Sequence, residues 1–361
     1  MLNAILNPRA FTVRTLILLL ILITCAAPAE ELPVAPLPPP VQPLSAITFG
    51  SCLKLDRPNT VWDAVLAQKS KLFLFTGDAI YKDTLVMDQK RAEFARLAAV
   101  PEFARFRRAV PILATWDDHD YGANDGGADY PQRDAAKRVF LDFFREPGDS
   151  PRRRPGGMQG AWVFGPPGRR TQVILLDTRY YRSRLTRGPL PGGYLPLNDP
   201  AATMLGDEQW AWLAAQLEAP AELRLIVSSI QVQPEEHRFE KWANLPLERG
   251  RLFKLIADTK ANGVVLISGD RHHGEISSMD VGCGYRVPEV TSSGMNCPNA
   301  VRPTEPNRHR EGEIFWTDNF GSVQVDWTAP DPTIDLNLHD GTGAVGRRKR
   351  LALSQLRPKT P

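Results

Sequence analysis

Residues 72–81 read LFLFTGDAIY, a short apolar run that ends in a glycine and an acid. A run of five such residues, bounded by turn residues, is typical of a strand that is buried on both faces. Gly77 and Asp78 follow the strand directly. The same arrangement recurs along the chain, in apolar runs that cover residues 46–50, 110–115, 172–176, 223–228 and 264–268.

Segments with helical spacing of apolar residues separate these runs. They cover residues 60–68, 91–99, 135–144, 207–217 and 248–260. Strands that alternate with helices predict an α/β fold built in layers. After Glu289 the pattern changes to strands without helices, in the stretches PEVTSS, GSVQVDWTA and TIDLNLHD. We expect this closing section to form the second sheet of one four-layer αββα sandwich, because no internal repeat or second domain is visible.

Most of the predicted strands end in polar residues that a plain turn does not require. In α/β sheets, ligand sites form outside the carboxyl ends of the strands. In chain order the ends read GSC at 50–52, GDAIY at 77–81, WDDHD at 116–120, DTR at 177–179, SSIQ at 228–231 and GDRHH at 269–273. Together they supply acidic, His, Cys and Tyr side chains, which are the ligands of a site for several metal ions.

Each of these ends also has a simpler interpretation. An acid after a strand, such as Asp78, is more often a turn residue or a helix cap. Cys52 alone is usual in a packed core, and His272 alone is compatible with a surface hydrogen bond. The run at 117–120 is harder to explain in this way, because three carboxylates within four residues repel one another unless solvent or cations neutralise them. The recurrence at many strand ends therefore favours metal binding.

The strand ends and their neighbours extend to eight motifs, which are GSC, GDAIY, WDDHDYGAN, DTRYYR, LGDEQWAWL, EKWANLPLERGRLFKLI, SGDRHHGEI and NFGSVQVDW. In this order they resemble the signatures of the PhoD-like alkaline phosphatases, a branch of the calcineurin-like metallophosphoesterases. The likeness extends over nearly all of residues 46–342. It implies a hydrolase that acts on phosphoric esters, as a phosphomonoesterase or a phosphodiesterase.

The resemblance implies a centre that holds Fe³⁺ together with one or more Ca²⁺, with Mn²⁺ and Zn²⁺ as alternatives. The residue chemistry agrees, because the Cys52 thiolate and the Tyr81 phenolate suit ferric iron better than magnesium or calcium. Asp78 is suited to bridge two ions, and other carboxylates suit calcium. The expected metal ligands are Cys52, Asp78, Tyr81, Asp117, Asp118, Asn124, Asp270 and His272.

The same likeness implies hydrolysis by in-line attack of a metal-bound hydroxide on phosphorus. His119 aligns with a His that lies near the leaving group in calcineurin-like enzymes, so we assign it as general acid or charge stabiliser. Arg179 is a candidate phosphate clamp, and a structural ion pair explains it equally well. A competing hypothesis is a catalytically inactive secreted protein that binds metal or phosphate on the same scaffold.

The N-terminus has the layout of a secretory signal peptide. Arg9 and Arg14 precede the apolar run 15–24, and the small residues at 27–29 offer a cleavage site after Ala29. We therefore expect export to the periplasm or the extracellular space. An uncleaved anchor or a lipid on Cys25 is the alternative, and membrane association would arise only in that way.

The predicted organisation has four parts. These are a signal peptide at 1–29, a Pro-rich linker at 30–45 that favours extended backbone, a metallophosphatase domain at 46–345 and a basic C-terminal tail at 346–361. The basic runs at 152–154 and 347–350 are expected to be solvated, in a loop and in the tail. The sequence makes no prediction of the oligomeric state.

The charge balance argues against nucleic acid as the main partner. The chain carries 44 Lys and Arg against 41 Asp and Glu, and the leader holds two of the Arg and no acid, so the remainder is almost neutral. Such a balance lacks the basic footprint of a nucleic-acid-binding protein.

Three cysteines follow the leader, and this odd number requires an explanation. In an oxidising compartment Cys283 and Cys297 could form a disulfide. Cys52 would then remain as a free thiol or a metal ligand.

Overall fold

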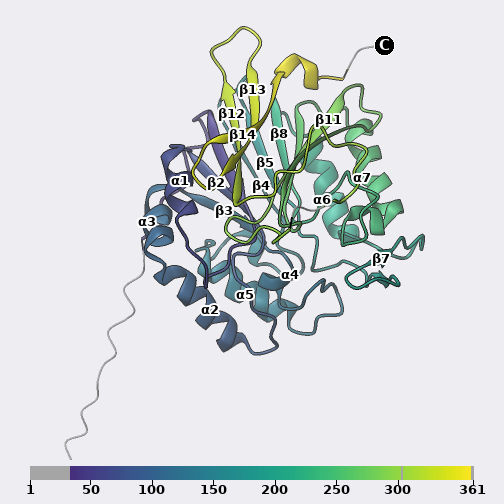
Figure 1. Ribbon diagram of the computed structural model, residues 1–361. Coiled ribbons are helices and arrows are strands. Elements are labelled where there is room, and N and C mark those ends of the chain that lie inside the picture. Colours follow the sequence, from purple (N-terminus) through teal and green to yellow (C-terminus); the bar gives the residue numbers. More distant parts are fainter. Residues whose placement is uncertain (1–32, 302–303, 359–361) are drawn as a thin grey trace, which may run out of the picture. The chain divides into compact units, whose positions relative to one another are not determined.

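The structure is a computed structural model that describes residues 33–301 and 304–358, so the predicted leader lies outside the described residues. Two six-stranded sheets pack against each other through a shared apolar core (Figure 1). The first comprises β1 (Ala46–Gly50), β2 (Leu72–Thr76), β3 (Ile112–Thr115), β12 (Asn319–Asp326), β13 (Thr333–Asp340) and β14 (Val345–Ala352), in the spatial order β14-β13-β12-β1-β2-β3. The second comprises β4 (Gly160–Phe164), β5 (Thr171–Leu175), β8 (Leu223–Val227), β9 (Val264–Ser268), β10 (Gly274–Asp280) and β11 (Arg286–Ser292), in the order β10-β11-β9-β8-β5-β4.

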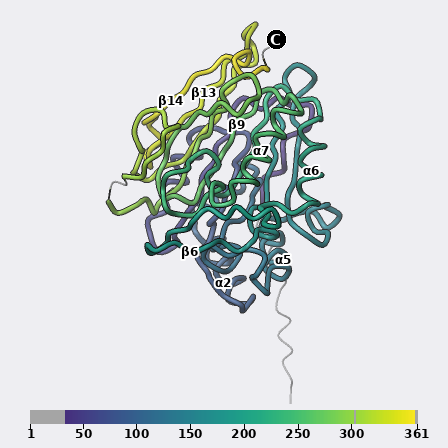
Figure 2. The backbone as a smooth tube through the Cα atoms, turned by 90° about the vertical axis from the view of Figure 1, so that its right-hand side faces the viewer, coloured from purple at the N-terminus to yellow at the C-terminus, as the bar shows by residue number. Residues whose placement is uncertain are grey.

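Helices cover both outer faces of the sheets. On the first sheet lie α1 (Val61–Ala67), α2 (Met87–Ala99), α3 (Pro101–Ala109) and α5 (Arg133–Phe143), and on the second lie α6 (Gly206–Glu218) and α7 (Pro246–Asp258). The two groups stand on opposite sides in Figure 1, and the turned view of Figure 2 brings α6 and α7 forward. The predicted αββα sandwich is therefore confirmed. Within the described residues, no helix has the length and apolar character needed to cross a bilayer.

Strand β2 shows why an uninterrupted apolar run suits this architecture. Leu72 and Leu74 belong to the core between the sheets, whereas Phe73 and Phe75 belong to the core beneath the helices. Successive side chains of a strand point to opposite faces, so both faces must be apolar when both are covered. Trp62 of α1 packs on the helix side, with its ring centre 5.4 Å from that of Phe73.

The parallel strands set the position of the predicted site. β1, β2 and β3 run parallel in the first sheet, and β5, β8, β9 and β11 run parallel in the second. The loops that follow the carboxyl ends of β1, β2, β3, β5 and β9 carry all the predicted site residues, with a short helix, α4 (Asp118–Tyr121), directly after β3. A small hairpin of β6 (Thr186–Arg187) and β7 (Tyr194–Leu195) lies outside the two sheets.

The expected origin of the second sheet is corrected. β12, β13 and β14 extend the first sheet, because β12 pairs antiparallel with β1. Of the closing strands, β11 is the one that lies in the second sheet, beside β9. Gly321 permits the pairing of β12 with β1, since a Cβ at this position would lie 2.1 Å from the Phe49 ring. A glycine in a strand commonly marks such a close approach.

The described part of the Pro-rich segment belongs to the folded domain and is not a free tether. The backbone N–H of Ala35 donates to the carbonyl of Arg107 at 2.8 Å, and the carbonyl of Pro40 accepts from Gly165 at 2.7 Å. Leu44 is completely buried in the core between the sheets. Extended backbone leaves its N–H and C=O groups available, and here they bond to the domain.

The two basic runs differ from the expectation only in part, because Arg154, Arg348 and Arg350 are exposed whereas Arg152 is buried. The run at 347–350 lies in the edge strand β14, where Arg350 binds Asp335 at 2.7 Å and Lys349 binds Glu311 at 2.6 Å. Charged side chains on an edge strand discourage pairing with other chains. In the other run, Arg152 is buried and binds Glu146 at 2.6 Å.

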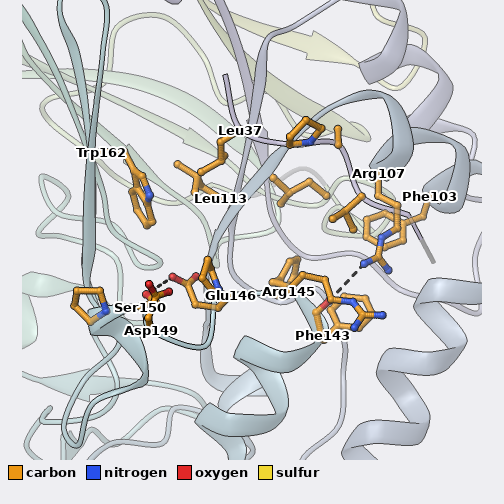
Figure 3. A pocket seen from close by; sticks show the side chains of 17 residues that line it. Leu37, Phe103, Arg107, Leu113, Phe143, Arg145, Glu146, Asp149, Ser150 and Trp162 are labelled. Carbon is orange, nitrogen blue, oxygen red and sulfur yellow. Dashed lines mark hydrogen bonds between the residues drawn. The ribbon is translucent and has the colours of Figure 1, made fainter. Parts of the chain in front are cut away.

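A cavity of about 540 Å³ lies where the edge strands β3 and β4 of the two sheets meet (Figure 3). Leu37, Leu113 and Trp162 give it an apolar wall, beside which Arg107 donates to the Phe143 carbonyl. None of the residues predicted for the metal site lines this cavity.

Candidate metal centre

Six of the eight predicted ligands, together with His119, lie in one cluster at the strand ends. Three groups of side chains each offer ligand atoms that lie within 4.8 Å of one another. Asp78 and Asp118 each belong to two groups, so the groups are continuous. They are Cys52, Asp78 and His272, then Asp78, Asp118 and His119, and finally Asp117, Asp118 and Asp270.

The backbone of four of these residues has an uncommon conformation. Cys52, Asp78, Asp270 and His272 have φ angles of 60°, 54°, 68° and 54°, in the left-handed region that non-glycine residues seldom adopt. Such conformations are unfavourable and collect at functional sites, where the surrounding structure holds them. Gly77 allows the loops after β2 and β3 to touch, because a Cβ on it would lie 2.3 Å from Asp117 Cβ.

Two carboxylate oxygens of the cluster are buried without a hydrogen bond. Asp117 Oδ1 accepts from Ser229 at 2.6 Å, but Asp117 Oδ2 and Asp270 Oδ2 have no hydrogen-bond partner among the described residues. A buried acceptor without a partner is costly, by about 1 to 3 kcal/mol. A hard cation would satisfy both oxygens, so the donor set fits metal binding.

Burial also opposes negative charge on the cluster. It raises the pKa values of Asp78, Asp117 and Asp270 well above their usual range, and the charge of Asp118 raises that of Asp78 further. For Asp118, burial raises the pKa, but the nearby Arg179 charge and other partners outweigh it, so this pKa is lowered. Cations would compensate the accumulated charge.

Tyr81 and His272 lie on the side of the cluster where the thiols of Cys52 and Cys297 are found. Tyr81 Oη lies 3.0 Å from His272 Nε2 and 3.7 Å from Cys297 Sγ. His272 Nδ1 contacts the Cys297 carbonyl at 2.5 Å, an interaction that orients the ring and leaves Nε2 for a ligand. Cys52 Sγ is 3.5 Å from Asp78 Oδ2 and 3.1 Å from Ser293 Oγ.

Cys297 was missed as a member of this cluster. The disulfide between Cys283 and Cys297, which the sequence left open, is not formed, and all three described cysteines are free thiols. Cys297 and Ser293 lie in the loop after the carboxyl end of β11, as the other site residues follow their strands. The same reasoning on strand ends, applied to β11, would have found them.

Arg179 is a buried ion-pair residue, and the geometry does not favour the phosphate clamp. Its side chain has no exposed surface, and Nε and one Nη donate to Asp117 Oδ1. The remaining donors bind Glu240, at 2.7 and 2.9 Å, and the Gly126 carbonyl at 3.3 Å. Arginine has five N–H donors, of which four donate hydrogen bonds here, and Nη2 also forms an ion pair with Glu240 Oε2. Glu240, which also pairs with Arg182 at 3.0 Å, was not predicted.

His119 and Asn124 lie toward the solvent side of the cluster. His119 Nδ1 is 2.9 Å from Asp83 Oδ1, and its ring centre is 4.4 Å from that of Tyr81. Burial lowers the pKa of His119, but Asp83 and Asp118 outweigh it and raise the pKa to about 9. Asn124 is exposed, and its amide donates to Asp125 Oδ2 at 2.7 Å.

Lys90 of α2 fixes the turn that carries His119. Its side chain is fully buried, and Nζ donates to the carbonyls of Lys82, His119 and Asp120 at 3.2, 3.1 and 2.6 Å. A charged donor shared by these three carbonyls ties the loop after β2 to the turn after β3.

Replacing Lys90 by Met is expected to lower the free energy of unfolding by about 3 kcal/mol, because buried carbonyl oxygens lose a charged donor. Urea unfolding of the metal-free proteins measures this. Lys254→Met is the matched control, since Lys254 forms an exposed pair with Asp258 on α7 and its loss should cost less than about 0.5 kcal/mol. Equal stability of the two variants would contradict the role of Lys90.

An αββα sandwich with acidic, His and Cys ligands at the carboxyl ends of its central strands defines a protein of the metallophosphoesterase fold class. The family model described as PhoD-like phosphatase matches residues 47–329. The chain therefore belongs to the PhoD-like phosphatase family.

The individual relatives share little sequence identity with this chain. Alkaline phosphatase D of Bacillus subtilis (strain 168) is 21% identical over 308 residues, which cover 71% of this chain and 50% of the relative. The chain thus spans about half the length of that curated relative. The solved structure of PhoD superposes with a TM-score of 0.69 at 19% identity, over 88% of this chain and 70% of that one. GAP50, described as the anchor in the inner membrane complex of Plasmodium, superposes with a TM-score of 0.54 at 12% identity, over 88% and 90% of the two chains.

Proposed function

We propose that this protein is a metal-dependent phosphoesterase that hydrolyses phosphate monoesters or diesters. The observation that carries the proposal is the continuous cluster of ligand groups around Asp78 and Asp118, in which two buried carboxylate oxygens accept no hydrogen bond. Membership of the PhoD-like phosphatase family supports the same reaction.

The donor set divides into a soft and a hard half. Cys52, Tyr81 and His272 would hold Fe³⁺, because thiolate, phenolate and imidazole suit that ion. Asp117, Asp118 and Asp270 would hold Ca²⁺ through oxygen. Asp78 belongs to both halves, since it is grouped with Cys52 and His272 as well as with Asp118. Mn²⁺ and Zn²⁺ remain the alternatives that metal analysis must separate from this assignment.

The residues around the ions have separate tasks. Bound cations would acidify the attacking water and neutralise the charge on the phosphoryl oxygens. His119 would donate the proton to the leaving oxygen, because Asp83 holds Nδ1 and thereby leaves Nε2 for the substrate. The Tyr81 ring packs beside the imidazole and restricts its rotation. Arg179 and Glu240 would keep Asp117 in place, as a buried ion pair away from the substrate.

Metal analysis of the purified protein, together with assays on p-nitrophenyl phosphate and bis-p-nitrophenyl phosphate, tests this proposal. We expect iron and calcium to copurify and at least one ester to be hydrolysed. Bound metal without turnover of either ester would instead favour the inactive metal- or phosphate-binding protein. Absence of any metal would contradict both functions.

Export is part of the proposed function and is supported by the charge and hydropathy pattern of residues 1–29. Cell fractionation and the mass of the mature chain test it. We expect a chain that begins at residue 30 in the exported fraction. An intact N-terminus in the membrane fraction would show an uncleaved anchor, and added lipid mass would show acylation of Cys25.

A further inference from the structure

The cavity of about 540 Å³ beside β3 and β4 is separate from the candidate metal centre. Much of its lining is apolar, with Leu113 of β3 and Trp162 of β4 in the wall (Figure 3). Val34 and Leu37 also line it and are each 41% exposed, so the cavity opens to solvent beside the described start of the Pro-rich segment. A concave apolar site of this size accommodates a small organic molecule.

Arg107 of α3 places a positive charge in this apolar wall. The residue is 5% exposed, and its guanidinium carbon lies 5.7 Å from the centre of the Phe103 ring and 5.2 Å from that of the Phe143 ring. The two rings are nearly parallel, at 13°, and their centres are 6.3 Å apart. A guanidinium stacks well on aromatic faces, and these contacts restrict the directions of its N–H groups.

The guanidinium of Arg107 lacks an anionic partner. Within residues 33–301 and 304–358 its side chain takes part in no ion pair, and its one hydrogen bond goes from Nη2 to the Phe143 carbonyl at 3.5 Å. Arginine has five N–H donors. The nitrogen atoms of Arg107 are not among the sealed side-chain atoms that lack a partner, and the residue lines the cavity, so its remaining donors are accessible from there. Burial lowers the pKa of Arg107 and the Arg145 charge lowers it further, as expected for a cation that is not compensated.

The two acids in the lining do not supply the missing partner. Glu146 binds Arg152 at 2.6 Å. Asp149 lies beside Ser150, at the end of the cavity opposite Arg107 (Figure 3). A ligand whose negative charge contacts Arg107 would therefore hold that charge away from Asp149.

A carboxylate matches a guanidinium, because its two oxygens accept parallel N–H bonds. We propose that this cavity binds an apolar carboxylate, with the carboxylate on Arg107 and a hydrocarbon or aromatic body against Leu113, Trp162 and Leu37. A hydrated inorganic anion would lose water against this wall without gaining apolar contacts, and a neutral apolar molecule would leave the guanidinium without a partner. The site is independent of the proposed phosphoesterase reaction, since none of the residues of the metal centre lines the cavity.

Octanoate and 1-octanol form a suitable ligand pair, because they share an alkyl chain and differ in charge. In isothermal titration calorimetry we expect the metal-loaded wild type to bind octanoate about tenfold more tightly than 1-octanol, as for a charge-assisted hydrogen bond. In Arg107→Met, which retains an apolar stem and removes the guanidinium, the affinity for octanoate should fall about tenfold and that for 1-octanol should not change. Arg108→Met is the control, since Arg108 is the exposed neighbour on α3 and does not line the cavity.

Absence of octanoate binding, or equal affinity of the wild type for the two ligands, would overturn the inference. Octanoate affinity that Arg107→Met leaves unchanged would also overturn it and would assign the binding to another place, such as the metal centre. Should Arg107→Met fail to fold, Leu37→Trp decides instead, because Leu37 lies at the rim of the cavity and outside both sheets. The larger side chain should lower the affinity for octanoate, and unchanged binding by this variant overturns the inference.

Discussion

Replacement of Asp78 by Ala or Asn is expected to abolish metal binding and hydrolysis together. Asp78 is grouped with Cys52 and His272 on one side and with Asp118 on the other, so its loss removes a ligand from both halves of the centre. Stabilisation of the transition state by cations amounts to several kcal/mol. The expected fall in kcat/KM is therefore about a thousandfold or more. Metal content and turnover of p-nitrophenyl phosphate, measured on the same preparation, provide the test.

The Asn variant separates the loss of charge from damage to the fold. Residue 78 has a φ angle of 54°, a conformation that Asn tolerates better than Ala. Its thermal stability should equal that of the metal-free wild type and should no longer rise when metal is added. Asp88→Asn is the control, because Asp88 is an exposed partner of Arg91 on α2. An Asp78→Asn protein that retains metal and activity would refute the proposed centre.

The sequence was sufficient for the sandwich and for much of its secondary structure. Runs such as residues 72–76 coincide with their strands because both faces of the central strands are covered, so apolar character marks the whole strand. The pairing of β12 with β1 was not predictable in the same way. This pairing depends on contacts between residues far apart in the chain, such as that of Gly321 with Phe49. The local sequence pattern of a strand does not indicate which other strand it pairs with.

The same distinction applies to the centre. The polar residues at the predicted strand ends include most of the clustered residues, because parallel strands bring their carboxyl ends together. Arg179 was found by position, but its partners Asp117 and Glu240 come from other loops, so its role as a buried ion pair could be recognised only in three dimensions. Cys297 was missed for another reason, since counting cysteines left it open as a disulfide partner of Cys283 and gave no sign of its place beside Tyr81.

Replacement of His119 by Ala should leave the metal bound and remove most of the turnover. It should differ in this from replacement of Asp78, which removes both. The imidazole of His119 bonds directly to Asp83. The contacts among Cys52, Tyr81 and His272 do not depend on the His119 ring. Loss of a general acid lowers the rate by about 10²- to 10⁴-fold. Metal content and single-turnover rates of the variant and the wild type measure both parts of this prediction.

The leaving group distinguishes proton donation from charge stabilisation by His119. An alkyl alcohol leaves poorly without a proton, whereas p-nitrophenolate is stable as an anion. If His119 is the general acid, His119→Ala should lose far more activity on an alkyl phosphate than on p-nitrophenyl phosphate. Asp83→Asn should show the same preference with a smaller loss, because it weakens the orientation of Nδ1 without removing the ring. Equal losses on both esters would assign His119 to charge stabilisation, and loss of bound metal would show that it is a ligand instead.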